Sequence, residues 1–200
     1  MSMSTTISTR DGSHAEQFDR YRTGMWVALA AVMMMFTALT SAYVVRAGTW
    51  NDWRPVGVPR LLWVSTGIIF LSSLAFEVAR RSLKGGRVAT FKRWLLVTVI
   101  LGLGFLAAQL LAWRELSAAG VYLATNPHGS FFYILTGVHG VHLLGGILAL
   151  DYLLLRSWRG RGAEEAVARK RLAVVNAAAL YWHFMFGVWI YLFLLLFLWR

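Results

Sequence analysis

The sequence predicts an all-α integral membrane protein, a bundle of five transmembrane helices, from its composition and its apolar segments. Of the 200 residues, 58% are hydrophobic and only 9 are acidic, against 20 Lys and Arg. A soluble domain of this length needs far more polar surface. Five apolar segments are each long enough for one crossing, which takes about 20 residues in a helix. We expect helices because a backbone in lipid must satisfy its own hydrogen bonds.

The segments follow a polar lead, residues 1–22, which is rich in Ser, Thr and charge. We expect this lead to be disordered or to form a short surface helix. Its acidic residues precede an apolar run that is too long for the core of a signal peptide, so we expect an uncleaved first span. Residues 23–200 then form one membrane domain. The expected spans are Gly24–Val45, Leu61–Ala79, Trp94–Trp113, Phe131–Leu155 and Ala173–Trp199.

The basic residues predict the orientation of the bundle. Fifteen Lys and Arg lie in the lead and in the second and fourth connections, and five lie on the other side. Because Lys and Arg accumulate in cytoplasmic loops, we expect the N-terminus inside and the C-terminus outside. Their short clusters between apolar runs are typical of membrane loops, so we expect no nucleic-acid partner.

Three histidines lie inside apolar runs, where ionisable groups are costly and mark candidate functional sites. His139 and His142 are three residues apart on one helix face, and His183 lies in the last span. We expect the three rings at one depth, as a polar cluster between the fourth and fifth helices. Four glycines of the fourth helix remove bulk, which lets neighbouring helices approach: Gly137, Gly140, Gly145 and Gly146.

The histidine cluster has two interpretations. Imidazole is a common ligand for haem iron, copper and zinc. A bis-histidine haem needs ligands on opposite ring faces, however, and a pair three residues apart supplies only one; pairing His183 with either of the others stays open. We favour histidines that hydrogen-bond across helices and fix their packing, with no metal bound by this chain.

Other polar residues of the spans are expected to pair locally. Glu77 precedes Arg80 and Arg81 by three and four residues, which predicts an ion pair near the inner surface; a proton-relay role stays open. Gln109 is expected to bond a neighbouring helix. The basic inner segments, with Arg80, Arg81 and Arg169, are expected to attract anionic lipid headgroups.

Three stretches carry a resemblance to a known family. They are Ala108-Gln109-Leu110, then the run GSFFYILTGVHGVH over residues 129–142, then YWHF at 181–184 with Val188-Trp189. From Gly24 onward the chain resembles subunit III of the haem–copper terminal oxidases, the cytochrome c and quinol oxidases, in the form with five helices.

The resemblance implies a subunit with no haem or copper of its own. It implies docking on the catalytic subunit I, with subunit II in the same complex, and places haem and copper in those partner subunits. Such a subunit is expected to hold phospholipid, to support proton uptake and to protect the catalytic core from inactivation during turnover. The expected location is the bacterial cytoplasmic membrane, as a multi-pass protein of aerobic respiration.

Two positions depart from the family pattern. Many members carry Glu at the position of Val32 and Asp at the position of Phe186. A divergent branch therefore stays open, including the accessory protein of a nitric oxide reductase. Two other classes also stay open, a stand-alone membrane cytochrome or metalloenzyme and a transporter or lipid-binding scaffold. The residues of this chain do not distinguish cytochrome c from quinol as the donor, nor oxygen from nitric oxide as the acceptor, because those sites belong to other subunits.

Overall fold

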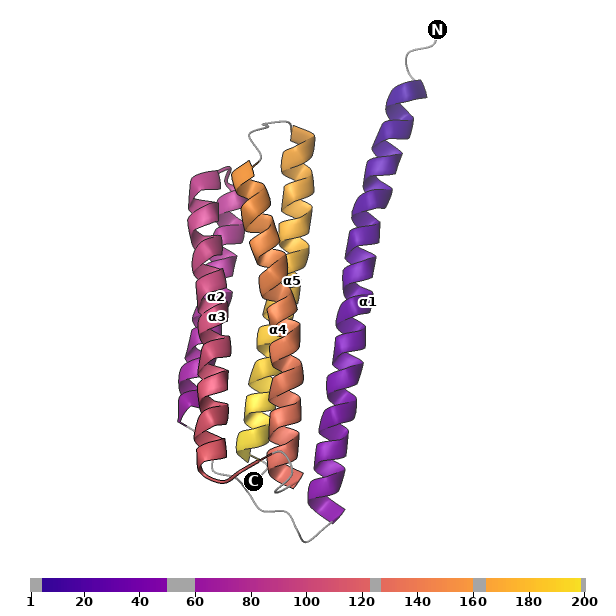
Figure 1. The fold of residues 1–200 in the computed structure, drawn as a ribbon. Coiled ribbons are helices and arrows are strands. Elements are labelled where there is room, and N and C mark those ends of the chain that lie inside the picture. The colour runs from indigo at the N-terminus through magenta and orange to yellow at the C-terminus, as the bar shows by residue number, and fades with distance from the viewer. Residues whose placement is uncertain (1–4, 50–59, 123–126, 160–164, 199–200) are drawn as a thin grey trace.

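The computed structural model of the chain describes residues 5–49, 60–122, 127–159 and 165–198, and side chains within these ranges except at 5–22, 158–159 and 165–171. Every regular element in the described ranges is a helix (Figure 1). The helices are α1 (Thr5–Thr49), α2 (Leu61–Lys84), α3 (Val88–Ala118), α4 (Pro127–Arg159) and α5 (Glu165–Leu198).

The structure confirms five helices that are long and apolar enough to cross a membrane. Their apolar stretches are Thr23–Thr49, Leu61–Lys84, Val88–Ala118, Pro127–Ser157 and Leu172–Leu198. Large apolar side chains cover the outside of the bundle as well as its core; Leu148 is 61% exposed and Val141 is 69% exposed. An outer surface of this kind suits hydrocarbon rather than water.

The backbone of the polar lead is helical, because α1 begins at Thr5 and continues without a break into the first span; the separate lead region that we expect stays a prediction. Residues 5–22 contain no proline, and extending a helix costs far less than nucleating one. The backbone therefore shows no boundary at Arg22. The side chains of the lead lie outside the described ones.

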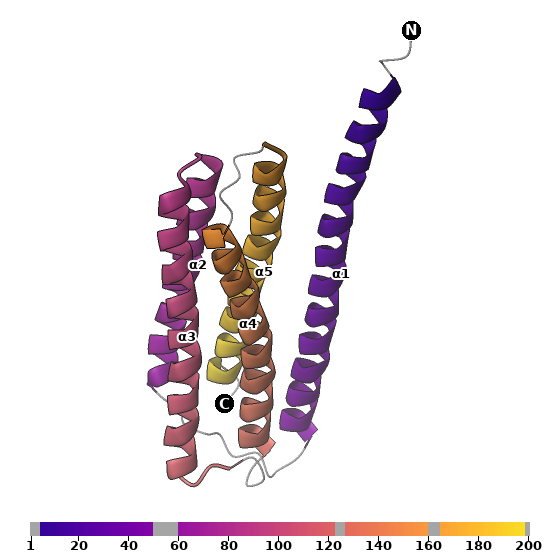
Figure 2. The same ribbon diagram turned by 45° about the horizontal axis from the view of Figure 1, so that its top comes forward.

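Helices α2 to α5 pack together, and α1 lies to one side of them (Figures 1 and 2). Among the described residues, the most extensive helix–helix contact joins α2 and α3, and α1 contacts α4 and α5. The start of α1 and the end of α5 lie at opposite ends of the bundle, as an odd number of crossings requires (Figure 1). Which end faces the cytoplasm stays a prediction.

Two glycines with positive φ end α2 and α3. Gly86 has φ 72° and Gly120 has φ 80°, values that a side chain disfavours. At each site the next residue donates a hydrogen bond back into the helix, from Arg87 N to Ser82 O at 2.9 Å and from Val121 N to Leu116 O at 3.1 Å. These bonds satisfy carbonyls that the helix end would leave unpaired. The connection between α2 and α3 is short, so these two helices are antiparallel neighbours.

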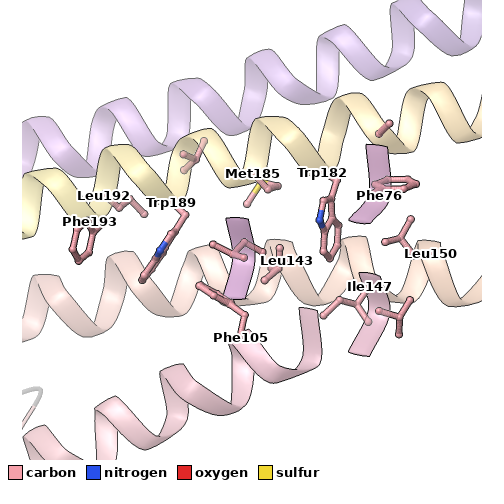
Figure 3. Packing of buried hydrophobic residues seen from close by; sticks show 14 of the residues in the cluster. Phe76, Phe105, Leu143, Ile147, Leu150, Trp182, Met185, Trp189, Leu192 and Phe193 are labelled. Carbon is pink, nitrogen blue, oxygen red and sulfur yellow. The ribbon is translucent and has the colours of Figure 1, made fainter. Parts of the chain in front are cut away.

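The core is centred on large side chains of α5, which point toward α3 and α4 (Figure 3). Trp182 and Trp189 are fully buried. A Cβ added at Gly102 on α3 would lie 3.0 Å from Trp182 Cη2, and one added at Gly146 on α4 would lie 3.2 Å from Trp182 Cζ3. The two glycines therefore admit the indole against their backbones, which is close packing by small residues.

The predicted orientation can be tested with single cysteines, because the chain has 0 Cys. We expect Ala119→Cys, just after α3, to react with a membrane-impermeant maleimide in intact cells with a permeable outer layer. We expect Lys84→Cys, at the end of α2, to react only after the membrane is opened. The reverse labelling pattern would mean that the N-terminus lies outside. Reaction of both cysteines from the same side would contradict a membrane crossing between them.

Candidate functional site

A polar network joins α2 and α5 within the apolar bundle. His183 Nδ1 on α5 lies 2.6 Å from Ser73 Oγ on α2, in a hydrogen bond. His183 Nε2 lies 3.8 Å from Glu77 Oε2, one helical turn further along α2. The ring therefore places one nitrogen on a hydroxyl and the other within ion-pair reach of a carboxylate.

Glu77 is held by two arginines of its own helix. Arg80 donates two hydrogen bonds of 2.7 Å to its two carboxylate oxygens, from Nε and Nη2. Arg81 donates a third bond of 2.7 Å to Oε1. Arg80 also reaches Asn176 Oδ1 on α5 at 3.4 Å. The ion pair that the sequence predicts is thus confirmed, and it extends across to a second helix.

The two arginines differ in their surroundings. The side chain of Arg80 is 25% exposed and that of Glu77 is 24% exposed, whereas that of Arg81 is 75% exposed. Glu77 lies about 10 Å from the end of α2 by the helical rise. A half-buried carboxylate at this depth needs charged partners, because desolvation is costly. We call Ser73, Glu77, Arg80, Asn176 and His183 the α2–α5 polar network.

His139 has a different environment, since it is fully buried among aromatic rings. Its ring centroid lies 6.3 Å from that of Phe36 on α1, 5.8 Å from Phe105 on α3 and 5.2 Å from Trp189 on α5. Neither ring nitrogen has a hydrogen-bond partner among the described residues. The His139 side chain therefore packs where α1, α3, α4 and α5 meet, through van der Waals contact with the surrounding rings.

His142 is half-buried and bonds within its own helix, from Nδ1 to Val138 O at 2.8 Å. Its backbone carbonyl accepts a 2.8 Å hydrogen bond from Tyr181 Oη on α5. The link between α4 and α5 at this level thus runs through a tyrosine and a carbonyl, not through the imidazole.

The predicted single histidine cluster between α4 and α5 is therefore wrong. His139 lies beside Trp189, whereas His183 faces α2. Positions 183 and 189 are about one and two-thirds turns apart at 3.6 residues per turn, so they point to different sides of α5. The six residues from His183 to Trp189 also correspond to about 9 Å along α5, so His139 and His183 differ in depth as well as in direction.

Gln109 and the aromatic side chains make further links between helices. Gln109 Nε2 donates to Ser65 Oγ on α2 at 2.9 Å, which confirms the expected bond to a neighbouring helix. Trp189 Nε1 on α5 donates to Thr66 Oγ1 on α2 at 3.0 Å. These polar side chains thus form hydrogen bonds between packed helices.

Two further predictions concern a metal site and the binding of lipid headgroups. Across the described ranges, no group of three or more His, Asp or Glu side chains is arranged to hold a metal ion. The side chain of Arg169 lies outside those described, so its expected contact with lipid headgroups stays a prediction.

Sequence reasoning missed two members of the α2–α5 polar network. Ser73 had a signal, because Ser73, Glu77 and Arg80 recur at a spacing that places them on one face of a helix. No sequence signal indicated Asn176, apart from its being an amide near the start of the last span. Its partner Arg80 is ninety-six positions away in the chain, and only the packing of α2 against α5 joins them.

Comparison with known proteins shows the family. A family model described as "Cytochrome c oxidase subunit III" matches residues 3–200. The chain belongs to this family. It is 32% identical to cytochrome c oxidase subunit 3 of Thermostichus vulcanus over 189 residues, which are 92% of this chain and 90% of the relative.

Two further relatives agree with the family model. Cytochrome c oxidase subunit 3 of Synechocystis sp. is 33% identical over 88% of this chain and 74% of the relative. A probable cytochrome c oxidase subunit 3 of Nocardia farcinica is 31% identical over 85% of this chain and 83% of the relative. The resemblance found in the sequence is confirmed, and this subunit III family member is a membrane protein of respiratory electron transport.

The two adjacent arginines offer a matched test of the polar network. We expect Arg80→Gln to lower the free energy of unfolding by about 1.5 to 3 kcal/mol, since it leaves the half-buried Glu77 with fewer charged donors. We expect Arg81→Gln to cost within about 0.5 kcal/mol, because that pair is exposed. Unfolding of the detergent-solubilised chain, followed by circular dichroism, measures both. Equal losses would show that burial does not decide the strength of the pair.

Proposed function

We propose that this chain is the non-catalytic subunit III of a bacterial respiratory haem–copper oxidase. In this proposal it lies in the cytoplasmic membrane, docks on the catalytic subunit I with subunit II in the same complex, and stabilises that assembly. The family match over residues 3–200 is the observation that carries the proposal. The reduction of oxygen takes place in the partner subunits.

The contacts of the histidines support a packing role. His183 is engaged by Ser73 on α2, and His142 is engaged by the carbonyl of its own helix. His139 is enclosed by aromatic rings. The side chains of His139 and His183 thus pack α4 and α5 against neighbouring helices, whereas the bond of His142 stays within α4. In this proposal haem and copper belong to the partner subunits.

Phospholipid is the second expected ligand of the proposed subunit. The side chain of Arg81 is 75% exposed while it bonds Glu77, so its remaining donors face outward. At the predicted cytoplasmic end it would meet the phosphates of anionic lipid, at about 1 kcal/mol for each basic residue near the surface. Arg80 and Arg169 are the other expected contributors at this end.

The two positions that depart from the family pattern have apolar surroundings in the structure. Val32 is half-buried against the core. Phe186 lies 5.9 Å from Phe70, centroid to centroid. Neither position supplies a carboxylate, so in this proposal any support of proton uptake passes through other groups, such as Glu77 beside His183.

These same departures are the reason to keep a second candidate, the accessory subunit of a nitric oxide reductase. The relatives named above carry the name of cytochrome c oxidase, and we favour that complex on their account. Membership in a subunit family also favours a supporting role over a stand-alone cytochrome.

Purification of the tagged chain from its own membranes in a mild detergent tests the proposal. We expect a haem–copper catalytic subunit to co-purify in a fixed ratio with this chain. We expect complex prepared without this chain to begin turnover at a similar rate per haem and to lose activity sooner. The reason is that the catalytic subunit then lacks the helices that pack against it.

The control is the same complex with Arg60→Gln, an exposed arginine remote from the polar network, which should behave as the unaltered complex. Two results would contradict the proposal. One is a chain that purifies only by itself. The other is stoichiometric haem in the isolated chain that His183→Ala removes.

A further inference from the structure

One side of α5 is left uncovered by the other described helices. Leu180, Tyr191 and Leu194 are exposed on this side, and so is Gly187. Together with His183 they follow one another at steps of three and four residues, which places all of them on one side of a helix. The α5 outer face, as we call it, thus consists of Leu180, His183, Gly187, Tyr191 and Leu194.

The α2–α5 polar network opens onto this face. His183 belongs to both, and its side chain is 38% exposed, beside the partly exposed Glu77. At 1.5 Å per residue, His183 lies about 16 Å along α5 from Leu172, where the apolar stretch begins. Ionisable groups at such a depth are costly and almost always face the interior of a bundle. The exposure of this imidazole therefore indicates that another chain covers it.

The hydrogen bonds of the network indicate what kind of group is needed. His183 Nδ1 is engaged by Ser73 Oγ, whereas His183 Nε2 lies 3.8 Å from Glu77 Oε2. That distance is longer than a direct hydrogen bond, so a hydroxyl or a side-chain amide beside the two atoms would bond them both. Arg80 and Arg81 already engage the Glu77 carboxylate, so no further cation is required. The missing group is therefore polar and uncharged.

The α5 outer face runs through much of the membrane. From Leu180 to Leu194 it rises about 21 Å at 1.5 Å per residue, against a hydrocarbon core of about 30 Å. A Cβ added at Gly187, near the middle, would meet nothing within 4 Å, so another backbone has room to approach. Acyl chains offer no hydrogen bond at the depth of His183. A transmembrane helix supplies both close apolar contact and a polar side chain.

We propose that one transmembrane helix of a partner polypeptide packs on the α5 outer face. This helix approaches most closely at Gly187 and places the side chain of a Ser, Thr, Asn or Gln against His183 and Glu77. The inference goes beyond the proposed function, because it assigns the docking face and the chemistry of the docked helix without requiring that helix to belong to the oxidase.

Photo-crosslinking in native membranes identifies what covers the face. A photoreactive residue replaces Leu180 in one variant and Leu194 in another, and the adducts are mapped by peptide mass spectrometry after purification. We expect both positions to capture the same transmembrane segment of one partner polypeptide, with a neutral polar residue at the level of His183. Adducts with lipid alone, or with a second copy of this chain, would overturn the proposal.

Two glycines offer a matched test of the close approach. A Cβ at Gly187 on α5 or at Gly145 on α4 meets nothing within 4 Å, so leucine at either position fits the chain itself. We expect Gly187→Leu to weaken retention of the captured partner in mild detergent about tenfold, because the larger side chain overpacks the contact. We expect Gly145→Leu to retain it as the unaltered chain does, and circular dichroism checks that both variants are folded. Equal retention in the two variants would overturn the proposal.

A double-mutant cycle tests the polar contact. His183→Leu is combined with alanine at the polar residue of the captured segment, and partner retention is measured for each single variant and for the pair. We expect the two losses to be coupled by about threefold, which is what one hydrogen bond between membrane helices contributes. Independent losses would overturn the polar contact. An intact oxidase complex with only lipid on the α5 outer face would contradict this inference alone, whereas a captured helix in a complex without a haem–copper subunit would contradict only the proposed function.

Discussion

The packing of one indole ring against the backbones of two glycines fixes the spacing of three helices. Trp182 on α5 meets Gly102 on α3 and Gly146 on α4 at different atoms of its six-membered ring. In lipid no hydrophobic effect drives helices together, so close van der Waals contact must do so. A side chain at either glycine would move the ring, and the ring is itself enclosed, with Phe76 on α2 at 6.4 Å. The arrangement of α2 to α5 depends on this contact.

The same contact positions the polar network. Phe76 and Trp182 pack in the core, and the next residue on each helix, Glu77 and His183, forms the polar pair. The rotation of α2 and α5 that buries the two aromatic rings therefore also brings the carboxylate and the imidazole within 3.8 Å. Arg80 then neutralises the carboxylate and reaches Asn176. The charges of this network are thus paired with one another, while large apolar side chains cover much of the outside of the bundle.

Sequence reasoning predicted what local spacing and composition determine. The five spans, the pairing of Glu77 with Arg80 and Arg81, and the link from Gln109 to another helix all follow from hydropathy and from helical period. The histidine cluster failed because neither the rotation of a helix about its axis nor its shift along that axis relative to a neighbour can be counted from the sequence; His139 lies beside Trp189, six residues from His183. The glycines show the same limit. Gly145 and Gly146 are neighbours in sequence, yet only Gly146 lies against a ring, and Gly102, which completes the contact, gave no signal.

These neighbouring glycines offer the most direct measurement of the central contact. A Cβ at Gly146 would lie 3.0 Å from Tyr181 Cε1 and 3.2 Å from Trp182 Cζ3, whereas one at Gly145 would meet nothing within 4 Å. Unfolding of the detergent-solubilised chain gives the free-energy change for each alanine. We expect Gly146→Ala to lower stability by about 1 to 3 kcal/mol through overpacking. We expect Gly145→Ala to raise it by about 0.5 to 1 kcal/mol through helix propensity. A rise for both would contradict the account, because the ring would then have room to move.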